Sequence, residues 1–213
     1  MARSFTNFPN CHSGSRLDEF CARLFNFQKG GTYVDIGSAR SMEHNNSHYL
    51  AVQLGWRGLC VDIDYNNEFS STYTDRQNCI FLKEDATKID YAVQFEKMSM
   101  PSSIDYLSLD VDVLSLAVAE ILPYDKYRFK IIGIEHDSCL HGDLYRAPQR
   151  ELLLSKGYVL ACADIFVRLS DFEDKPFEDW WLDPQYFGSD IIEKVKSSSC
   201  YPEDIIVKLG GKA

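Results

Sequence analysis

The chain has 213 residues, of which 45% are hydrophobic and 25% charged, with a formal net charge of -10 and a pI near 4.9. This length is enough for one globular domain with a sizeable core, and the ordinary composition argues against disorder. The acidic balance disfavours a nucleic-acid partner, because binding a phosphate backbone requires clustered Lys and Arg side chains.

Seven cysteines are scattered along the chain without a CxxC pair or zinc-ribbon spacing. An odd, unpaired set is typical of a reducing compartment, where a buried thiol behaves as a small hydrophobic side chain. Apolar runs stay well short of the roughly 18 residues of a membrane span, and the N-terminus lacks the apolar core of a signal peptide. We therefore expect a cytoplasmic protein with no membrane span. The sequence does not indicate an oligomeric state.

The first predicted elements surround a glycine turn. Residues 1–14 are polar and without periodicity, which predicts a leader outside the fold, and residues 15–213 are expected to form a single domain. From Ser15, apolar residues fall at helical spacing as far as Phe25, and this helix is expected to cover an edge of the sheet. Residues 32–36 and 59–63 are predicted strands on either side of a turn at Gly37 and a helix, which makes one βαβ unit.

The rest of the chain continues the alternation. Predicted helices or turns lie at 68–76, 87–98, 114–122 and 145–156, and predicted strands at 79–82, 104–109, 130–134, 157–163 and 205–209. This order predicts an α/β fold with a central, mostly parallel sheet of about seven strands and helices on both faces. The acidic, aromatic segment from Phe177 to Phe187 is expected to be a lid or an edge-covering loop, because Pro184 disrupts regular structure.

The turn after the first strand is a candidate ligand site. In a βαβ unit this turn lies against a helix N-terminus, where free backbone N–H groups let a nucleotide-like ligand approach. Gly37 and Ser38 replace the usual three glycines, which disfavours a dinucleotide and leaves room for a smaller adenosyl ligand. Asp62 or Asp64, at the tip of the second strand, would accept hydrogen bonds from ribose hydroxyls. The alternative is a core βαβ unit that binds no ligand.

Carboxylates follow five of the predicted strands, at the end where ligands bind in parallel sheets. The fourth and fifth strands end in LSLDVD and IIGIEHD, so their polar residues should lie within a few ångströms of one another. These residues are Asp110, Asp112, Glu135, His136 and Asp137. Neighbouring carboxylates repel unless a cation or shared protons intervene, and oxygen ligands favour Mg²⁺, Mn²⁺ or Ca²⁺ over zinc. The alternative is a structural cluster paired with Arg128, Lys130 or Arg146.

Seven short pieces of sequence follow one another in a fixed order: VDIGSA, NNSHYLAVQLGWRGLCVDID, DRQNC, IDYLSLDVD, IIGIEHD, RELLLSKGY and EDWWLDP. In this order and at this spacing they resemble the FkbM family of class I S-adenosylmethionine-dependent methyltransferases, from about Tyr33 to Tyr186. The resemblance implies a Rossmann-like fold whose last strand is antiparallel, and S-adenosyl-L-methionine as the cofactor.

The resemblance also implies site residues. The cofactor-binding residues would be Asp35, Gly37, Ser38, Ser47, Asp62, Asp85 and Ala86. A divalent metal, Mg²⁺ or Mn²⁺, would be held by Asp110, Glu135 and either His136 or Asp137, of which we expect Asp137.

The expected activity is methylation of a sugar hydroxyl, on a glycan or a deoxyhexose such as rhamnose. Because a hydroxyl is too weak an acid to ionise at neutral pH, we expect Asp112 or His136 to accept its proton beside Asp110 and the metal. Two alternatives remain: a methyltransferase with a non-sugar acceptor, and a non-catalytic Rossmann-like binding module. A short chain of this kind is also compatible with one module of a larger glycan-synthesis protein.

Overall fold

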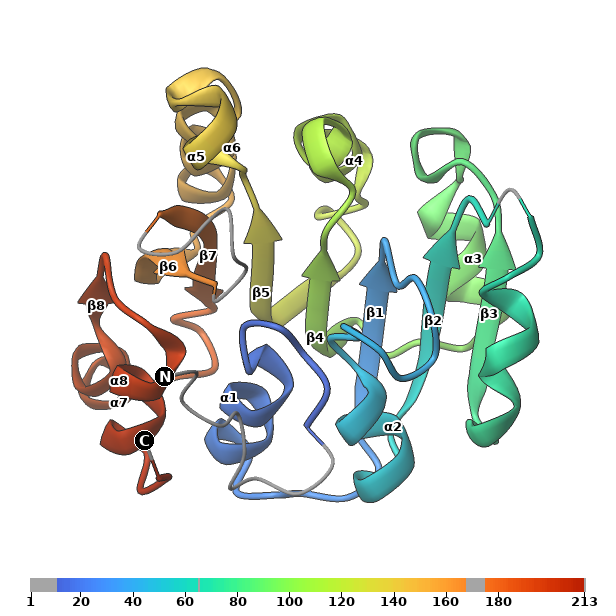
Figure 1. Ribbon diagram of the computed structural model, residues 1–213, viewed down its shortest axis with the longest axis horizontal. Helices are drawn as coiled ribbons and strands as arrows, with labels where there is room; N and C mark the ends of the chain where they lie inside the picture. Colours follow the sequence, from blue (N-terminus) through green and yellow to red (C-terminus); the bar gives the residue numbers. More distant parts are fainter. Residues whose placement is uncertain (1–10, 65, 168–174, 213) are drawn as a thin grey trace, which may run out of the picture.

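A central sheet of eight strands organises the protein (Figure 1). The computed structural model describes residues 11–64, 66–167 and 175–212. The strands are β1 (Thr32–Ile36), β2 (Arg57–Asp62), β3 (Cys79–Lys83), β4 (Ser103–Leu109), β5 (Arg128–Glu135), β6 (Val159–Phe166), β7 (Pro176–Leu182) and β8 (Ser197–Ser198). Their order across the sheet is β3-β2-β1-β4-β5-β7-β6-β8. Among the described strands, β7 alone runs antiparallel to both of its neighbours, and the other pairs are parallel. The predicted mostly parallel α/β sheet is confirmed.

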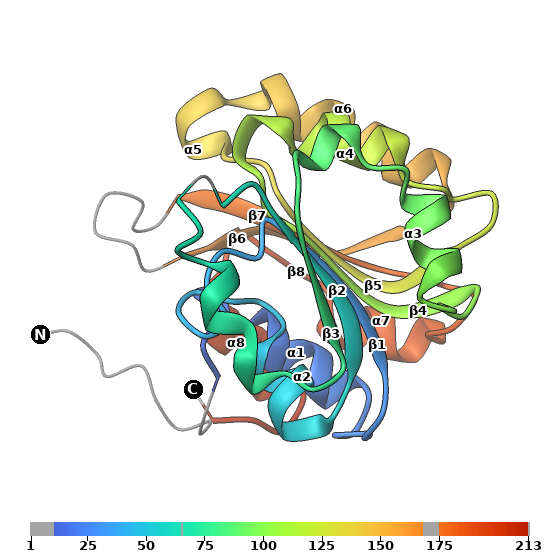
Figure 2. The same cartoon turned by 90° about the vertical axis from the view of Figure 1, so that its right-hand side faces the viewer.

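Helices cover both faces of the sheet, as predicted (Figure 2). One layer contains α1 (Leu17–Leu24), α2 (His48–Leu54), α7 (Ser189–Val195) and α8 (Pro202–Lys208). The opposite layer contains α3 (Tyr91–Lys97), α4 (Ser115–Ile121), α5 (Ser138–His141) and α6 (Asp143–Ser155). Short 3₁₀ turns η1 (Ser70–Asp75), η2 (Ala86–Lys88) and η3 (Asp112–Leu114) follow strand ends. In the described part of the chain, none of the helices is both long and apolar enough to cross a membrane.

The strands supply two hydrophobic cores because successive side chains point to opposite faces. In β4, Tyr106 belongs to the core beneath α1 and α2, whereas its neighbour Leu107 belongs to the core beneath α3, α4 and α6. Both side chains are fully buried. Burial on both faces explains why the parallel strands appear in the sequence as continuous apolar runs.

Helix α1 lies over the middle of the sheet, so the prediction that it covers an edge was wrong. A Cβ atom on Gly133 of β5 would lie 2.1 Å from Leu17, which shows how closely α1 approaches this strand. One turn further, the ring centroid of Phe20 lies 4.5 Å from that of Trp180 in β7. The edges of the described sheet are formed by β3 and β8 instead.

Two predictions about the C-terminal third were also wrong. The segment expected to be a lid contains β7, an inner strand in which Trp180 and Trp181 are fully buried on opposite faces. Pro184 lies beyond the end of this strand and does not interrupt it. The strand expected at 205–209 is helix α8, which starts at Pro202, a residue favoured in the first turn of a helix.

The predicted leader is only partly described, since residues 1–10 lie outside the described residues. Its last residues contact the fold. The hydroxyl of Ser13 donates to Asn46 Oδ1 at 2.6 Å, and Ser13 Oγ accepts from the backbone N–H of Leu17 at 3.2 Å. The chain from Ser13 onward is therefore attached to the turn that follows β1.

Candidate functional site

The turn after β1 depends on Gly37. Its φ of +83° is a left-handed conformation, and a Cβ atom there would lie 1.6 Å from the carbonyl oxygen of Asp110. The backbone N–H groups of Gly37 and Ser38 both donate to the carbonyl of Val61, at 2.9 and 3.1 Å. Only glycine lets the ends of β1, β2 and β4 approach this closely.

A buried arginine holds the loop between Ser38 and Ser47 in place. Arg76 donates to Asn45 Oδ1 at 2.6 Å and to Ser47 Oγ at 2.9 Å. The Ser47 hydroxyl in turn donates to Asp35 at 2.5 Å. Burial raises the pKa of Asp35 to about 6, although the Ser47 hydrogen bond opposes this rise. Asp35 and Ser47, both predicted to bind cofactor, are thus buried and support the loop from beneath.

The tips of β2 and β3 carry Asp62 and Asp85. Asp62 accepts from the backbone N–H of Ala39 at 2.8 Å with one oxygen and from that of Asp64 at 3.1 Å with the other. It is partly exposed, and each carboxylate oxygen has a second lone pair for a ligand.

The other acidic residues near these tips stabilise turns. Asp64 accepts from the backbone N–H groups of Phe69 and Ser70, at 2.8 and 2.9 Å. Asp85 caps η2, which begins at Ala86, and hydrogen bonds from Thr87 lower the pKa of Asp85 to about 2. Asp62 is therefore better placed than Asp64 to contact a ligand.

Four carboxylates gather at the ends of β4 and β5, and we call Asp110, Asp112, Glu135 and Asp137 the acidic cluster. The backbone N–H of Asp112 donates to Glu135 Oε2 at 3.2 Å. Ligand atoms of Asp112, Glu135 and Asp137 lie within 4.8 Å of one another. Burial raises the pKa of Glu135, and the charge of Asp110 raises it further. The cluster is therefore suited to hold a shared proton or a cation.

The structure brings these predicted residues together, with two differences from the sequence analysis. The three oxygen donors that lie close enough to hold one metal ion include Asp112 in place of Asp110. The Arg and Lys side chains proposed as alternative partners form ion pairs elsewhere. These pairs are Arg128 with Asp183, Lys130 with Asp105, and Arg146 with Asp164.

His136 lies on the opposite face of the sheet from the acidic cluster. Its Nδ1 accepts from the backbone N–H of Ser138 at 3.2 Å, and its Nε2 lies 3.5 Å from Asp179. His136, Asp164 and Asp179 form a second group of possible metal ligands. Arg150 already forms ion pairs with Asp179 at 2.7 Å and with Asp164 at 2.8 Å. The imidazole is fully buried in this network. Side chains alternate along a strand, so the residue after Glu135 must face away from it.

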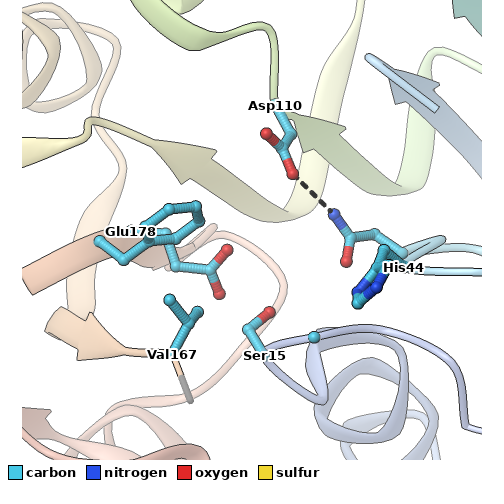
Figure 3. A pocket seen from close by; sticks show the side chains of 8 residues that line it. Ser15, His44, Asp110, Val167 and Glu178 are labelled. Carbon is cyan, nitrogen blue, oxygen red and sulfur yellow. Dashed lines mark hydrogen bonds between the residues drawn. The ribbon is translucent and has the colours of Figure 1, made fainter. Parts of the chain in front are cut away.

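A cavity of about 320 Å³ lies next to the acidic cluster, on the α1 side of the sheet (Figure 3). Its lining residues come from five segments of the chain and surround one hollow. They are Gly14, Ser15, His44, Asn46, Asp110, Val167, Phe177 and Glu178. Asn46 Nδ2 approaches Asp110 to 3.5 Å. The site therefore continues from the acidic cluster into a partly open cavity of ligand size.

Glu178 is a site residue that the sequence analysis missed. It pairs directly with Glu135 across β5 and β7 and accepts a hydrogen bond from Trp180 Nε1. Burial raises the pKa of Glu178 to about 7. Glu178, Trp180 and Leu182 are two residues apart, so in a strand they share one face of the sheet. This spacing could have placed Glu178 beside Glu135 only if the segment had been predicted as a strand.

Comparisons with known proteins agree with this architecture. No protein-family model matches the sequence, and the search of curated proteins also gave no match. Among solved structures, the chain resembles the fibrillarin/Nop5p complex, with a TM-score of 0.50 and 12% identity over 83% of this chain and 84% of that one. It also resembles the 23S rRNA methyltransferase ErmE, with a TM-score of 0.50 and 9% identity over 91% and 76%.

A SAM-dependent methyltransferase from Aquifex aeolicus has a TM-score of 0.49 and 15% identity over 81% of this chain and 94% of that one. At such identities the likeness concerns the fold alone. The sheet order and the likeness to the two structures with TM-scores of 0.50 give the chain the Rossmann-like fold found in class I methyltransferases.

Proposed function

We propose that the protein is an S-adenosylmethionine-dependent O-methyltransferase whose acceptor is a sugar hydroxyl. The supporting observation is the continuity of the site. The turn at Gly37 joins the tip of β2, with its partly exposed Asp62, to Asp110 and the cavity. An adenosyl donor and an acceptor need this kind of adjoining space, because methyl transfer requires the two reactants in line.

The residues at the turn fit the donor. Asp62 retains free lone pairs for ribose hydroxyls, and Asp85 with Ala86 would border the adenine. Asn46 would face the amino-acid end of the donor, where its side-chain oxygen suits the ammonium group. When bound, the donor supplies a methyl group on a positively charged sulfur. Gly37 and Ser38 keep the turn free of bulky side chains at the point of approach.

The acidic cluster fits a divalent cation, because hard cations prefer several carboxylate oxygens. We propose that Asp112, Glu135 and Asp137 hold Mg²⁺ or Mn²⁺, next to Asp110 in the same acidic cluster. A cation there would favour the ionised form of the acceptor hydroxyl.

Asp110 is our proposed proton acceptor. Among the predicted catalytic residues, Asp110 lines the cavity, whereas Asp112 is exposed and His136 is buried on the other face. A positioned base typically contributes about 10²- to 10⁴-fold in rate. Glu178 faces Asp110 across the cavity and would orient the acceptor.

The cavity wall supports a sugar as the acceptor. Ser15 and Glu178 offer hydroxyl and carboxylate groups, while Val167 and Phe177 offer an apolar surface. A sugar presents hydroxyls at its edge and C–H groups on its face, so such a mixed wall suits it. Trp180 and Trp181 are fully buried and belong to the cores.

Binding of S-adenosylhomocysteine tests the proposal. At about 100 times its dissociation constant, this product should stabilise the protein by about 2.7 kcal/mol in a thermal-unfolding assay. Asp62→Asn should weaken binding measured by calorimetry, while Asp190→Asn on the exposed start of α7 should leave it unchanged. Absence of any binding to the wild-type protein would refute the methyltransferase proposal.

One observation favours a second candidate, a non-catalytic binding module. The carbonyl oxygen of Ser38 already accepts hydrogen bonds from Asn45 at 2.7 Å and from Tyr73 at 3.0 Å. This polar group of the turn is therefore occupied by the protein itself and is not offered to a donor. Formation of S-adenosylhomocysteine from the donor, assayed with rhamnose-containing glycans with and without chelator, separates the candidates. The enzyme should turn over and lose activity with chelator, whereas a binding module should bind without turnover.

A further inference from the structure

Two thiols lie side by side beneath the loop that follows β1. Cys60 on β2 and Cys79 on β3 have their sulfur atoms 3.3 Å apart. In the parallel register Cys79 lies opposite Gly58, two residues before Cys60, so both side chains point to the same face of the sheet. All seven cysteines of the protein are free thiols. This pair needs only a small movement to reach bonding distance.

The surroundings of the two thiols differ. Cys60 is fully buried, and burial raises its pKa. Cys79 is partly exposed, and its pKa is lowered by its hydrogen bond to Cys60, by Tyr33 and by the charge of Arg76. The guanidinium of Arg76 lies 3.4 Å from the sulfur of Cys60. Cys79 is therefore the thiol that a small oxidant can reach, and Cys60 is its nearest partner.

We propose that Cys60 and Cys79 form a reversible disulfide when the protein meets a hydroperoxide. The Cys79 thiolate attacks the peroxide, an S–O bond forms, the O–O bond breaks and one water leaves after protonation. The Cys60 thiol then attacks this sulfenic acid, the S–S bond forms, the S–O bond breaks and a second water leaves. Two thiols lose two electrons and two protons, and hydrogen peroxide is reduced to two waters.

The bond would close a segment that is important for the site. The residues between the two cysteines include Asp62 at the tip of β2 and Arg76, which holds Asn45 and Ser47 of the loop. Cross-linking restricts the unfolded chain, so the oxidised protein should melt several degrees higher than the reduced one. This inference does not depend on methyl transfer.

The test uses the reduced full-length protein, treated with hydrogen peroxide and mapped by mass spectrometry without reductant. The linked Cys60–Cys79 peptide should form before any linkage that involves Cys11, Cys139 or Cys200, which are also partly exposed. Cys60→Ser should abolish the link and leave Cys79 as a sulfenic acid that dimedone traps. The control variant Cys139→Ser should form the link as the wild type does.

The melting temperature provides a second readout. It should rise after oxidation in the wild type and in Cys139→Ser, and reductant should reverse the rise. If Cys60 and Cys79 are both alkylated when the peroxide-treated protein is unfolded without reductant, while other cysteines have oxidised, the proposal is overturned. The wild-type peptide map decides this even if Cys60→Ser fails to fold.

Discussion

At the scale of single residues, the site depends on how closely backbone segments approach one another. Gly37 combines a left-handed φ with direct contact to the backbone of Asp110. The sequence could indicate that this glycine belongs to a turn, because it ends an apolar run before small residues. Its contact with β4 could not be predicted, since that contact depends on which strand lies next to β1.

Replacing Gly37 by alanine should therefore destabilise the protein strongly. The new Cβ would overlap the Asp110 carbonyl and the residue would be held at φ +83°, so we expect a loss of more than about 3 kcal/mol in the free energy of unfolding. Gly157→Ala is the matched control, because Gly157 has φ +78° but no atom within 4 Å of the position that a Cβ would take. That variant should lose only about 1 kcal/mol. Equal losses in urea unfolding would contradict a close approach at Gly37.

At the scale of elements, the site is formed by the ends of β4 and β5 together with β7. The sequence predicted β4 and β5 and the carboxylates that follow them, because these strands are buried on both faces and end in acidic residues. It missed β7, because the polar and aromatic residues of this strand suggested a loop. Glu178 was missed for the same reason. Side-chain alternation alone predicts that His136 faces away from Glu135. The sequence analysis instead grouped His136 with its acidic neighbours Glu135 and Asp137 because they are adjacent in the chain.

Helix α8 was also assigned to the wrong type of element. Ile205 and Ile206 were interpreted as part of a strand, although their burial against α1 and α7 follows from helical spacing with Leu209. A short apolar run fits either element, and tertiary packing decides between them.

The acidic cluster should make the protein responsive to divalent cations. Mn²⁺ should raise the melting temperature of the wild type, because it offsets the repulsion among Asp112, Glu135 and Asp137. Asp137→Asn should reduce that rise, whereas Asp143→Asn, whose side chain is 71% exposed, should retain it. An equal response to Mn²⁺ in both variants would place the cation elsewhere.

At the scale of the whole molecule, buried carboxylates make stability depend on pH. Burial raises the pKa of Asp18 and Glu178 to about 7 and that of Asp35 to about 6, above ordinary carboxyl values near 4. Groups with a raised pKa in the folded state bind protons more readily when folded. Their contribution to stability is complete below about pH 4 and is lost as pH rises through 6 to 7.

We therefore expect the free energy of unfolding to fall by about 2 kcal/mol or more between about pH 5 and pH 8. His48, whose pKa is lowered by burial, acts in the opposite direction but is a single group. Asp35→Asn keeps an acceptor for Ser47 and should flatten the profile. Urea unfolding across this range provides the measurement, and stability that rises steadily from pH 5 to 8 would show that these carboxyl groups are not desolvated.

The central claim is that one continuous site at the carboxyl ends of the strands binds an adenosyl donor beside a metal-binding acidic cluster. A crystal structure of the protein with S-adenosylhomocysteine and Mn²⁺ tests it most directly. We predict density for the ribose at Asp62, for the amino-acid end beside Asn46, and an anomalous peak for Mn²⁺ among Asp112, Glu135 and Asp137. Ligand density away from the turn at Gly37, or a site left empty at saturating ligand, would contradict the account.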